Sequence, residues 1–286
     1  MVNPVTPKEK VIEGVATLTD AFLKRRLIKL TGNIGQFLNV NPFLVSALRD
    51  FHSFNKLSDL AEFMFIGHMA SGHSTGFGKL VDEKILPEVF GTLKLTARVR
   101  AEKLMTAAAF NEIDHVVNPQ SPDQWSLLSL KAGPWTIQDS TAHSLYEAFK
   151  GIGDFQRFGK EIVVGVFYGN TGSLTNKYGI LRGVNPRQQD QFVVLNHVRV
   201  LAGREFWAWL NGGVAETQEW VLEGTRLGAS MLLNQNAEHR DIIKNAPRRL
   251  AEEIAKKYNL SVEQDIDWVK LLLAINDPPV EGGGAR

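Results

Sequence analysis

The sequence predicts an α/β fold, of the α+β kind, in which a mixed central sheet is flanked by helices and extra helices extend both ends of the chain. Apolar residues recur at three- and four-residue spacing between residues 8 and 30, which predicts a long amphipathic helix. The segment EIVVGVFY, residues 161–168, is almost continuously apolar and lies between glycines, which is typical of a buried strand. From residue 205 onward the pattern is helical again. Strands that lie between helical regions favour a sheet embedded in helices.

Composition limits the class of protein. The chain has 286 residues, 44% of them hydrophobic and 22% charged, so it is long enough for one large or two small domains and is not expected to be disordered. Cysteine is absent, which excludes disulfides and thiolate zinc sites and fits a cytoplasmic location. We expect neither a secretory signal nor a membrane partner, because no apolar run reaches the roughly 18 residues of a membrane span. The net charge is +1, so binding of nucleic acid would depend on local basic clusters.

The first part of the chain is expected to hold helices and one glycine-rich loop. The helix over residues 8–30 ends in several basic residues, which either favour the helix dipole as a solvated end or form a phosphate-contacting patch. Asn41 and Pro42 are typical of a helix start, and another helix is expected over residues 57–69. Residues 67–78 hold four glycines and two histidines and predict a loop, in which His73 would contact a phosphate or cap the next helix.

A helix predicted over residues 79–90 places an acid on its apolar face. Asp82 lies in the middle of the face that the buried-type residues form, whereas Glu83 lies toward its edge. A carboxylate on the buried side of a helix is unfavourable unless it is paired or bound to a cation. An ion pair with a neighbouring lysine or arginine and a metal site both remain open.

A hairpin follows, with strands over residues 112–117 and 125–131 and a turn-rich break between them. Because strand side chains alternate between faces, Ser129 and Lys131 share a face, as do Glu112 and Asp114. We expect the hairpin to bring Asp114, Ser129 and Lys131 around one point. Asp114 would bind Mg²⁺ beside a phosphate, and Lys131 would position a water and stabilise the developing charge. The alternative is an exposed hairpin with a weak surface ion pair.

The remainder is expected to complete the sheet and to supply a loop that contacts DNA. A helix over residues 136–150 and a strand within residues 191–201 are predicted, with later helices near 248–258 and 267–275. The chain would divide into a helical region at 1–70 that is a candidate for dimerisation, a catalytic core at 71–204, and a helical region at 205–286 packed on the core. An ordinary surface loop is the alternative to a DNA-contacting one after the buried strand, where the candidates for contact are Asn170, Ser173, Asn176, Lys177, Tyr178, Arg182 and Arg187.

At these segments the chain resembles the PD-(D/E)XK nucleases, and more closely the type II restriction endonucleases that recognise the interrupted palindrome RGGNCCY. The resemblance runs from about Asn41 to the end of the chain and is carried by GHSTGFGK at 72–79, DEKILP at 82–87, EIDHV at 112–116, LLSLKAG at 127–133, VVGVFYGN at 163–170 and EFWAWLN at 205–211. It implies Mg²⁺-dependent double-strand cleavage of DNA at a GGNCC-type site, with Asp114 as the metal-binding acid and Lys131 as the motif lysine. It also implies a homodimer, because a palindrome that two identical subunits read requires a two-fold axis.

The chain departs from this family at Ser129, where an acid usually stands two residues before the lysine. A hydroxyl is a poor metal ligand, and some members of the superfamily take the missing acid from a neighbouring helix. Asp82 and Glu83 are the candidates for that second metal-binding acid, with Glu112 as a third. A repair or structure-selective nuclease of the same superfamily, or a non-catalytic DNA-binding protein on its fold, stays open. The bases that are read, the cut position and the overhang do not follow from the sequence.

Overall fold

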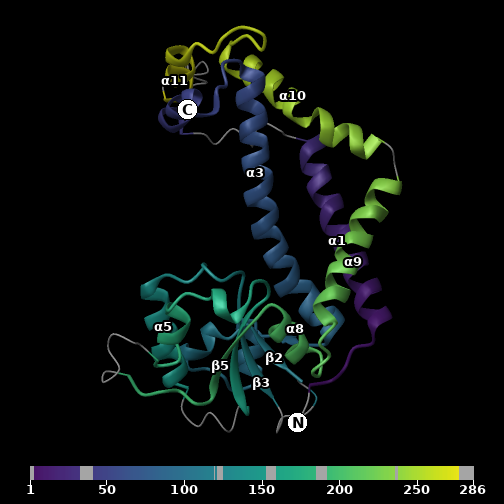
Figure 1. Ribbon diagram of the computed structural model, residues 1–286, viewed down its shortest axis with the longest axis vertical. Coiled ribbons are helices and arrows are strands. Elements are labelled where there is room, and N and C mark those ends of the chain that lie inside the picture. The colour runs from purple at the N-terminus through teal and green to yellow at the C-terminus, as the bar shows by residue number, and fades with distance from the viewer. Residues whose placement is uncertain are drawn as a thin grey trace, which may run out of the picture. The chain divides into compact units, whose positions relative to one another are not determined.

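A five-stranded mixed sheet forms the centre of the region that carries the predicted hairpin. The computed structural model describes residues 3–32, 41–118, 120, 125–152, 159–184, 192–235 and 238–276. Its strands follow the spatial order β1-β2-β3-β4-β5, and Figure 1 labels β2, β3 and β5. They comprise β1 (Leu93–Lys94), β2 (His115–Val117), β3 (Ser126–Lys131), β4 (Glu161–Val166) and β5 (Val198–Ala202). The predicted α/β class is therefore confirmed, with the second strand of the hairpin at the centre of the sheet.

The two halves of the sheet differ in strand direction. β1, β2 and β3 pair antiparallel, and His115 lies opposite Leu128 in the register. β3, β4 and β5 run parallel, and Ser129 lies opposite Val164. A parallel pair needs a crossover connection, and helix α5 (Asp139–Lys150) supplies it between β3 and β4.

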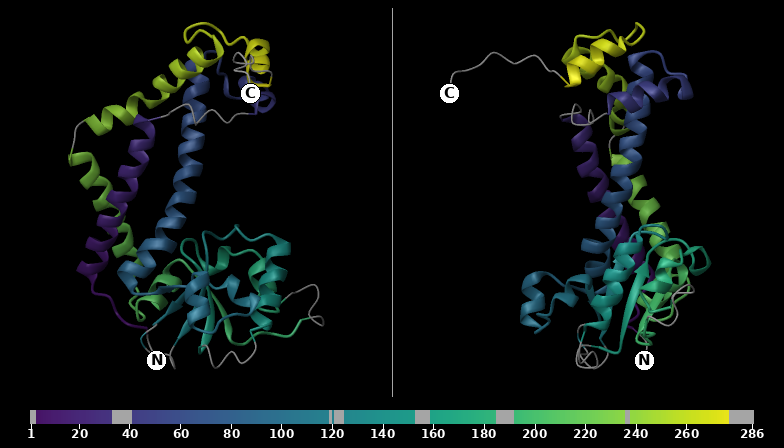
Figure 2. Two further views of the ribbon diagram at one scale, coloured as in Figure 1. Left: turned by 180° about the vertical axis from the view of Figure 1, so that it is seen from behind. Right: turned by 90° about the vertical axis from the view of Figure 1, so that its left-hand side faces the viewer.

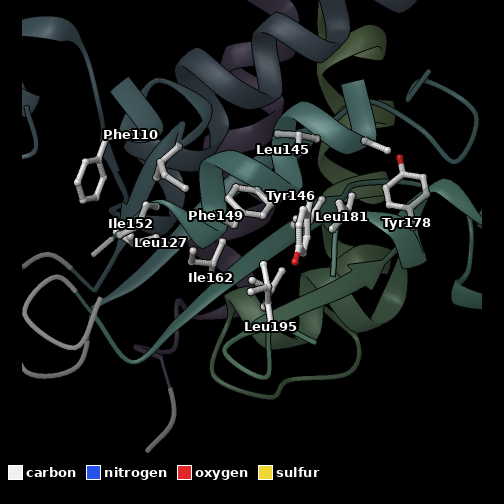
Figure 3. Packing of buried hydrophobic residues seen from close by; sticks show 14 of the residues in the cluster. Phe110, Leu127, Leu145, Tyr146, Phe149, Ile152, Ile162, Tyr178, Leu181 and Leu195 are labelled. Carbon is white, nitrogen blue, oxygen red and sulfur yellow. The ribbon is translucent and has the colours of Figure 1, made fainter. Parts of the chain in front are cut away.

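Helices cover both faces of the sheet. On one face, Tyr146 and Phe149 of α5 pack against Leu127 and Ile162 in a continuous hydrophobic core (Figure 3). On the other face lies Phe206 of α8 (Arg204–Leu210), so close to Gly165 that a methyl group there would overlap its ring. We call these the α5 face and the α8 face. Because direct neighbours along a strand point to opposite faces, Ser129 and Lys131 belong with Leu127 on the α5 face.

The chain forms two compact units, each built from separate stretches of sequence. The sheet unit comprises residues 1–20 and 78–229, and the helical unit comprises residues 21–77 and 230–286. The chain changes from one unit to the other inside three helices: α1 (Lys8–Thr31), α3 (Leu57–Leu80), near its end, and α9 (Thr217–Gln235). The division by function at residues 70 and 204 stays a prediction.

The helical unit has its own hydrophobic core. Leu57 and Leu60 of α3 pack there with Leu250 of α10 (Glu238–Tyr258), and all three are buried. The unit also holds α2 (Pro42–His52) and α11 (Trp268–Asn276), which contact each other; α11 is drawn in yellow in Figure 2. Within the described residues, no helix combines the length and hydropathy needed to cross a lipid bilayer.

The loop predicted over residues 67–78 is wrong, because α3 runs as a helix through all four glycines and continues into a π-helix, η2 (Val81–Val89). Gly72 and Gly76 lie one turn apart on the side that faces Arg26 of α1, and the Arg26 guanidinium donates to the carbonyl oxygen of Gly72. A Cβ at Gly76 would overlap that guanidinium. The glycines therefore permit close approach of two helices, and tertiary packing overrides their low helix propensity.

Three predicted elements differ from the structure at their boundaries. Glu112 is the last residue of a short 3₁₀-helix, η3 (Ala108–Glu112), so the strand predicted from residue 112 begins only at His115. The strand predicted within residues 191–201 is β5, which begins at Val198 and ends one residue later than predicted, at Ala202. The helix predicted from residue 136 begins at Asp139. Glu112 and Asp114 therefore do not alternate along one strand as predicted. The smaller elements of the sheet unit are α4 (Ala97–Glu102), η5 (Thr171–Ser173) and α7 (Lys177–Ile180).

Candidate active site

Asp114 lies at the point where β2 and β3 separate. Its backbone N–H donates a hydrogen bond to the carbonyl oxygen of Leu128 on β3 at 2.8 Å. Its carboxylate oxygen Oδ2 then accepts the backbone N–H of Leu130 at 2.7 Å. A side chain thus takes the place of a backbone carbonyl at the end of the ladder. Because Leu130 stands between Ser129 and Lys131, the carboxylate is fixed beside the backbone that carries both predicted site residues.

Lys131 is the last residue of β3 and is half-buried. Among the described residues its side chain makes no hydrogen bond or ion pair, and its alternating position assigns it to the α5 face with Ser129. A half-buried ammonium group that pairs with no protein carboxylate retains its donors for another acceptor. The weak Asp–Lys surface pair considered from the sequence is therefore not formed.

Ser129 is fully buried, and its Oγ has no hydrogen-bond partner among the described residues. Buried polar groups are normally satisfied, and an unsatisfied one is destabilising by about 1–3 kcal/mol. Packing of the protein alone therefore does not explain a hydroxyl at this position. Ser129 follows Leu128 in the chain, and the carbonyl oxygen of Leu128 accepts the hydrogen bond from the Asp114 N–H. The Ser129 Oγ, which lacks a hydrogen-bond partner among the described residues, therefore lies next to the residue that anchors Asp114.

Asp82 is engaged in an ion-pair network. Its Oδ1 lies 2.8 Å from Nε2 of His115, and the Lys94 ammonium donates to its Oδ2. The His115 ring is fully buried, and its Nδ1 lies 3.0 Å from the Thr92 hydroxyl. The neutral tautomer that is protonated on Nε2 satisfies both contacts. Of the two alternatives left open for Asp82, the structure shows the ion pair.

The pKa of Asp82 reflects this network. Burial by itself raises the pKa of the carboxyl, but the hydrogen bonds from His115 and Lys94 outweigh burial and hold the pKa below its ordinary value. Because His115 lies opposite Leu128, the network belongs to the α8 face, whereas Ser129 belongs to the α5 face.

The other candidate acids are not gathered at the hairpin. Glu83 is exposed on η2, and Glu112 ends the 3₁₀-helix before β2. Within the part of the chain that the structure describes, no group of three or more His, Asp or Glu side chains is placed to hold a metal ion. Mg²⁺ in phosphoryl-transfer sites often takes only one or two carboxylates and completes its shell with water and phosphate. Asp114, with Ser129 as an adjacent hard oxygen, fits that minimal requirement, and a second acid is not in place.

The polar loop after β4 contains both structural and unpaired residues. Asn170 and Ser173 cap η5 reciprocally: the Asn170 side chain accepts the Ser173 N–H at 3.0 Å. Lys177 is half-buried at the start of α7, and Nε of Arg182 is buried without a hydrogen-bond partner among the described residues. Lys177 and Arg182 thus retain donors for an anion, whereas the Asn170 Oδ1 and the Ser173 hydroxyl are engaged in the reciprocal cap. Arg187 lies outside the described residues.

His73 belongs to the helical unit and lies inside α3, so the predicted role as a helix cap is wrong. Its ring packs edge-on against Phe22, with ring centroids 6.3 Å apart. Burial first, and then the nearby Arg26 charge, lower the pKa of His73 below its ordinary value. A histidine held neutral in this way lacks the positive charge that a phosphate contact would use. Its predicted contact with DNA stays a prediction.

Two tyrosines contact the loop that follows Lys131: Tyr178, which sequence analysis named only as a candidate for contact with DNA, and Tyr168, which it did not single out. The Tyr178 hydroxyl donates to the carbonyl oxygen of Gly133 at 2.8 Å, and burial raises the pKa of Tyr178. The Tyr168 ring lies so close to Gly133 that a Cβ there would overlap it. Trp135 is 71% exposed in the same loop. Tyr168 is the last residue of the predicted apolar strand. Residues at the carboxyl end of a parallel strand often lie at a ligand site, and this position could have identified Tyr168 from the sequence.

The carboxyl ends of β3, β4 and β5 meet at one edge of the sheet because these strands are parallel. Lys131 and the loop that begins at Phe167 therefore share this edge, which is where open α/β sheets commonly place ligands. A cavity of about 360 Å³ belongs to the helical unit, where Leu57 and residues 259–270 line it, and it contains none of the predicted site residues. No protein-family model and no curated protein sequence matches the chain.

Proposed function

We propose that the protein is a Mg²⁺-dependent type II site-specific deoxyribonuclease of the PD-(D/E)XK kind, which makes double-strand cuts at a short interrupted palindrome of the GGNCC type. The observation that carries the proposal is the Asp114 carboxylate, fixed on the N–H of Leu130 between Ser129 and Lys131, whose ammonium forms no ion pair with the described residues. It stands at the end of an antiparallel hairpin in a mixed sheet with helices on both faces. The residues and their setting support what the resemblance implies.

The roles of the chain's own residues follow from their contacts. Asp114 would hold Mg²⁺ through the carboxylate oxygen that Leu130 leaves free. When bound, the metal would polarise a phosphate and lower the pKa of a coordinated water. Lys131 would donate hydrogen bonds to the attacking water or to a phosphate oxygen and stabilise the negative charge that develops there. Fixing Asp114 by a backbone hydrogen bond reduces the reorganisation that binding requires.

Asp82 and Glu83 remain the proposed sources of the second acid. Asp82 is the inward one, but Lys94 and His115 already compensate its charge. Its network lies on the α8 face and Ser129 on the α5 face, so Asp82 would reach a metal beside Ser129 only if Lys94 released it and the carboxylate moved to the other face. Glu83 is exposed and forms no ion pair with the described residues, so it is free to move but is not held at the hairpin.

The proposal is tested by digestion of plasmid DNA with Mg²⁺. Wild-type protein should give discrete fragments, whereas Asp114→Asn and Lys131→Met should cut at least about 100-fold more slowly, in line with the loss of a metal ligand or a charge-stabilising donor. Both variants should keep the wild-type melting temperature to within a few degrees and bind DNA. Lys84→Met is the matched control, because Lys84 is an exposed lysine of the same unit that pairs with Glu88. Wild-type rates in both hairpin variants would refute the assignment.

The same assay separates the alternatives. Smeared products or cutting that depends on branches or ends would indicate a repair or structure-selective nuclease. Ser129 and the absence of a three-acid group among the described residues favour a second candidate, a non-catalytic DNA-binding protein. DNA binding without cutting under any divalent cation would establish that candidate instead. A cytoplasmic location and duplex DNA as the partner belong to the proposal.

A further inference from the structure

The basic end of α1 belongs to the helical unit, where it packs against α3. Residues 21–31 contain four cations and no acid: Lys24, Arg25, Arg26 and Lys29. Such a segment is either a solvated helix end, whose cations offset the helix dipole, or a site for an anion. The contacts of these cations within the helical unit distinguish the two.

The dipole of α1 is already offset by a residue of another helix. Arg249 of α10 donates from Nη1 to the carbonyl oxygen of Leu30 at 3.2 Å and from Nη2 to that of Thr31 at 3.4 Å. These last carbonyl groups are the ones that cations at a helix end normally contact. Arg25 and Lys29 are exposed and form no ion pair with the described residues. Compensation of the dipole therefore does not account for them.

Arg26 is held in place by both helices. Its guanidinium carbon lies 5.3 Å from the centre of the Phe22 ring, and Nη2 donates to the carbonyl oxygen of Gly72 on α3. The other terminal nitrogen, Nη1, has no hydrogen-bond partner among the described residues. A guanidinium group fixed in this way can bind an oxyanion with little further loss of side-chain entropy.

Arg26 and His68 both border an open space at Gly72. A methyl group at Gly72 would lie 3.8 Å from Nη1 of Arg26 and 3.9 Å from Nε2 of His68, and no other heavy atom would be closer. An anion placed there accepts a hydrogen bond from Nη1 and lies beside the His68 ring, whose protonated form it favours. The glycine thus leaves room for an anion between a fixed guanidinium group and an imidazole.

The electrostatic potential at this place is positive. Burial first, and then the charges of Arg26 and Lys29, lower the pKa of His68 below its ordinary value. Burial, Arg26 and His68 lower the pKa of His73 in the same order of importance. A nearby carboxylate would act in the opposite direction. An anion would therefore relieve repulsion among these groups, whereas a cation would add to it.

We propose that Arg26 and the open space at Gly72, with His68 and Lys29 beside them, form a phosphate-binding site of the helical unit. The planar guanidinium group matches the oxygen atoms of a phosphate, and the exposed Lys29 adds a mobile positive charge. The phosphate comes either from the backbone of a DNA duplex or from a small phosphate compound. The site goes beyond the proposed function and rests on it only for DNA as the source.

The first measurement is the titration of His68 in the full chain, followed by NMR in inorganic phosphate and in chloride at equal ionic strength. Phosphate should raise the pKa of His68, because a bound anion stabilises the charged imidazolium. The titratable and charged groups around this ring are Arg26 and Lys29 of α1 and His73 of α3, with Arg249 at the end of α1. His68→Gln assigns the resonance.

Gly72→Ala obstructs the space without disturbing the fold, because its methyl group meets both nitrogens at ordinary contact distances and alanine favours the helix. It should weaken the binding of inorganic phosphate at least about tenfold, as expected for a lost charge-assisted hydrogen bond. Gly67→Ala is the matched control, since a methyl group there meets nothing within 4 Å in the same helix. This control should bind phosphate as wild type does.

A second pair of variants tests the charge. Lys29→Gln should also weaken phosphate binding, because it removes a positive charge that acts on His68. Lys56→Gln removes the same formal charge sixteen residues before Gly72, about 24 Å away along α3, and should leave phosphate binding unchanged.

Duplex DNA with a GGNCC-type site identifies the source of the phosphate. Without divalent cations, so that no cutting occurs, Gly72→Ala should bind the duplex more weakly than Gly67→Ala and with a salt slope smaller by about 1. This result identifies a backbone phosphate. Equal affinities of the two variants for DNA, together with weaker binding of inorganic phosphate by Gly72→Ala, identify a small phosphate compound.

Two results would overturn the inference. One is a pKa of His68 that is the same in phosphate and in chloride for wild type, and the other is an equal shift in Gly72→Ala. The proposed function fails separately: a chain that binds phosphate at Gly72 but does not cut DNA with Mg²⁺ has the site without the nuclease activity.

Discussion

At the scale of single residues, the ion pair of Asp82 makes a prediction about pH. The folded-state pKa of Asp82 lies below its ordinary value of 3.8, so the unfolded chain binds this proton more tightly than the folded one. The contribution of the carboxylate to the free energy of unfolding is therefore complete well above pH 3.8 and is lost as the pH falls through the lower, folded-state value. Asp82→Asn should reduce the free energy of unfolding at pH 7 by about 1–3 kcal/mol.

The measurement is urea unfolding of both proteins at several pH values. The difference between wild type and Asp82→Asn should narrow as the pH is taken from 7 to below 3.8, because protonation removes the same charge from wild type. Glu83→Gln serves as the control, since Glu83 is the exposed neighbour, and it should change stability little at any pH. A difference that stays constant across this range would contradict the assigned ion pair.

Tyr178 makes a second prediction at this scale, and it rests on the proposed nuclease activity. Its hydroxyl holds the carbonyl oxygen of Gly133, two residues after Lys131. Tyr178→Phe should reduce the free energy of unfolding by about 1 kcal/mol and slow DNA cleavage by roughly tenfold, because the loop that follows Lys131 loses the hydrogen bond that positions Gly133. The readout is kcat, measured with the KM for DNA.

Tyr146→Phe separates positioning from stability in this experiment. Tyr146 is a buried tyrosine of the same core, and its hydroxyl also donates to a carbonyl oxygen, that of Val193 at 3.3 Å. The control should lose a similar amount of stability while kcat stays at the wild-type value. Equal losses of kcat in the two variants would show that Tyr178 has only a structural part.

The sequence predicted the position of a residue correctly where that position depends on a single helix or strand. The helical wheel places Asp82 in the middle of the apolar face and Glu83 toward its edge; in the structure Asp82 is partly buried and hydrogen-bonded to His115, whereas Glu83 is exposed. The partners of Asp82 lie on β1 and β2, so their identity depends on the sheet register, which periodicity does not reveal. The hydrogen bond from Leu130 to Asp114 was missed for the same reason, since it depends on where two strands part.

At the scale of elements, the glycines of α3 make a prediction with opposite outcomes at two positions. Replacing a helical glycine with alanine normally stabilises by about 1 kcal/mol. Gly67→Ala should show this gain, because a Cβ there meets nothing within 4 Å. Gly76→Ala should be less stable than Gly67→Ala by about 1–2 kcal/mol, because its methyl group displaces the Arg26 guanidinium and meets the Phe22 ring.

Thermal unfolding of the two glycine variants beside wild type checks this prediction. The two substitutions are chemically identical and lie in the same helix, so each is the control for the other. If Gly76→Ala gains as much as Gly67→Ala, the close packing of α1 against α3 in the helical unit is wrong.

The elements predicted most reliably were those whose pattern reflects burial. EIVVGVFY gave β4 because both faces of that strand are covered, and the apolar periodicity of residues 8–30 gave α1. The loop at residues 67–78 was mispredicted because glycine disfavours helices in isolation, whereas here the glycines lie under a second helix. The helix propensity of a residue takes no account of a neighbouring helix, although close packing against that helix can favour a glycine.

At the scale of the whole molecule, the proposed DNA binding would have to depend on a few placed cations, because the net charge is only +1. Lys177 and Arg182 form no ion pair with the described residues. If each contacts one phosphate, Lys177→Ala with Arg182→Ala should reduce the slope of log K against log salt by about 2 and weaken binding at low salt. Fluorescence anisotropy across a salt series measures both quantities.

The control for this double variant is Lys84→Ala with Arg98→Ala. These cations belong to the same unit but already form ion pairs with Glu88 and Glu102. The control should retain the wild-type slope although it removes the same formal charge. An equal change in both double variants would mean that overall charge, rather than these two positions, determines binding.

The overall class of fold followed from the order of segments, but the assembly of the units did not. A strand-rich stretch between helical regions predicts a sheet embedded in helices, and the structure confirms a mixed sheet with helices on both faces. The helical unit joins residues 21–77 to residues 230–286 across the whole sheet unit. Amphipathic patterns show that each helix needs a partner, without showing which distant helix supplies it.

This nesting has a consequence for the chain as it leaves the ribosome. Leu57 and Leu60 emerge early, but Leu250, which packs with them, follows only after roughly 150 residues of the sheet unit. At the usual 5–20 residues per second, the early helices wait on the order of 10 to 30 seconds with their inner surfaces uncovered. During translation these surfaces therefore require either a chaperone or temporary burial within the nascent chain itself.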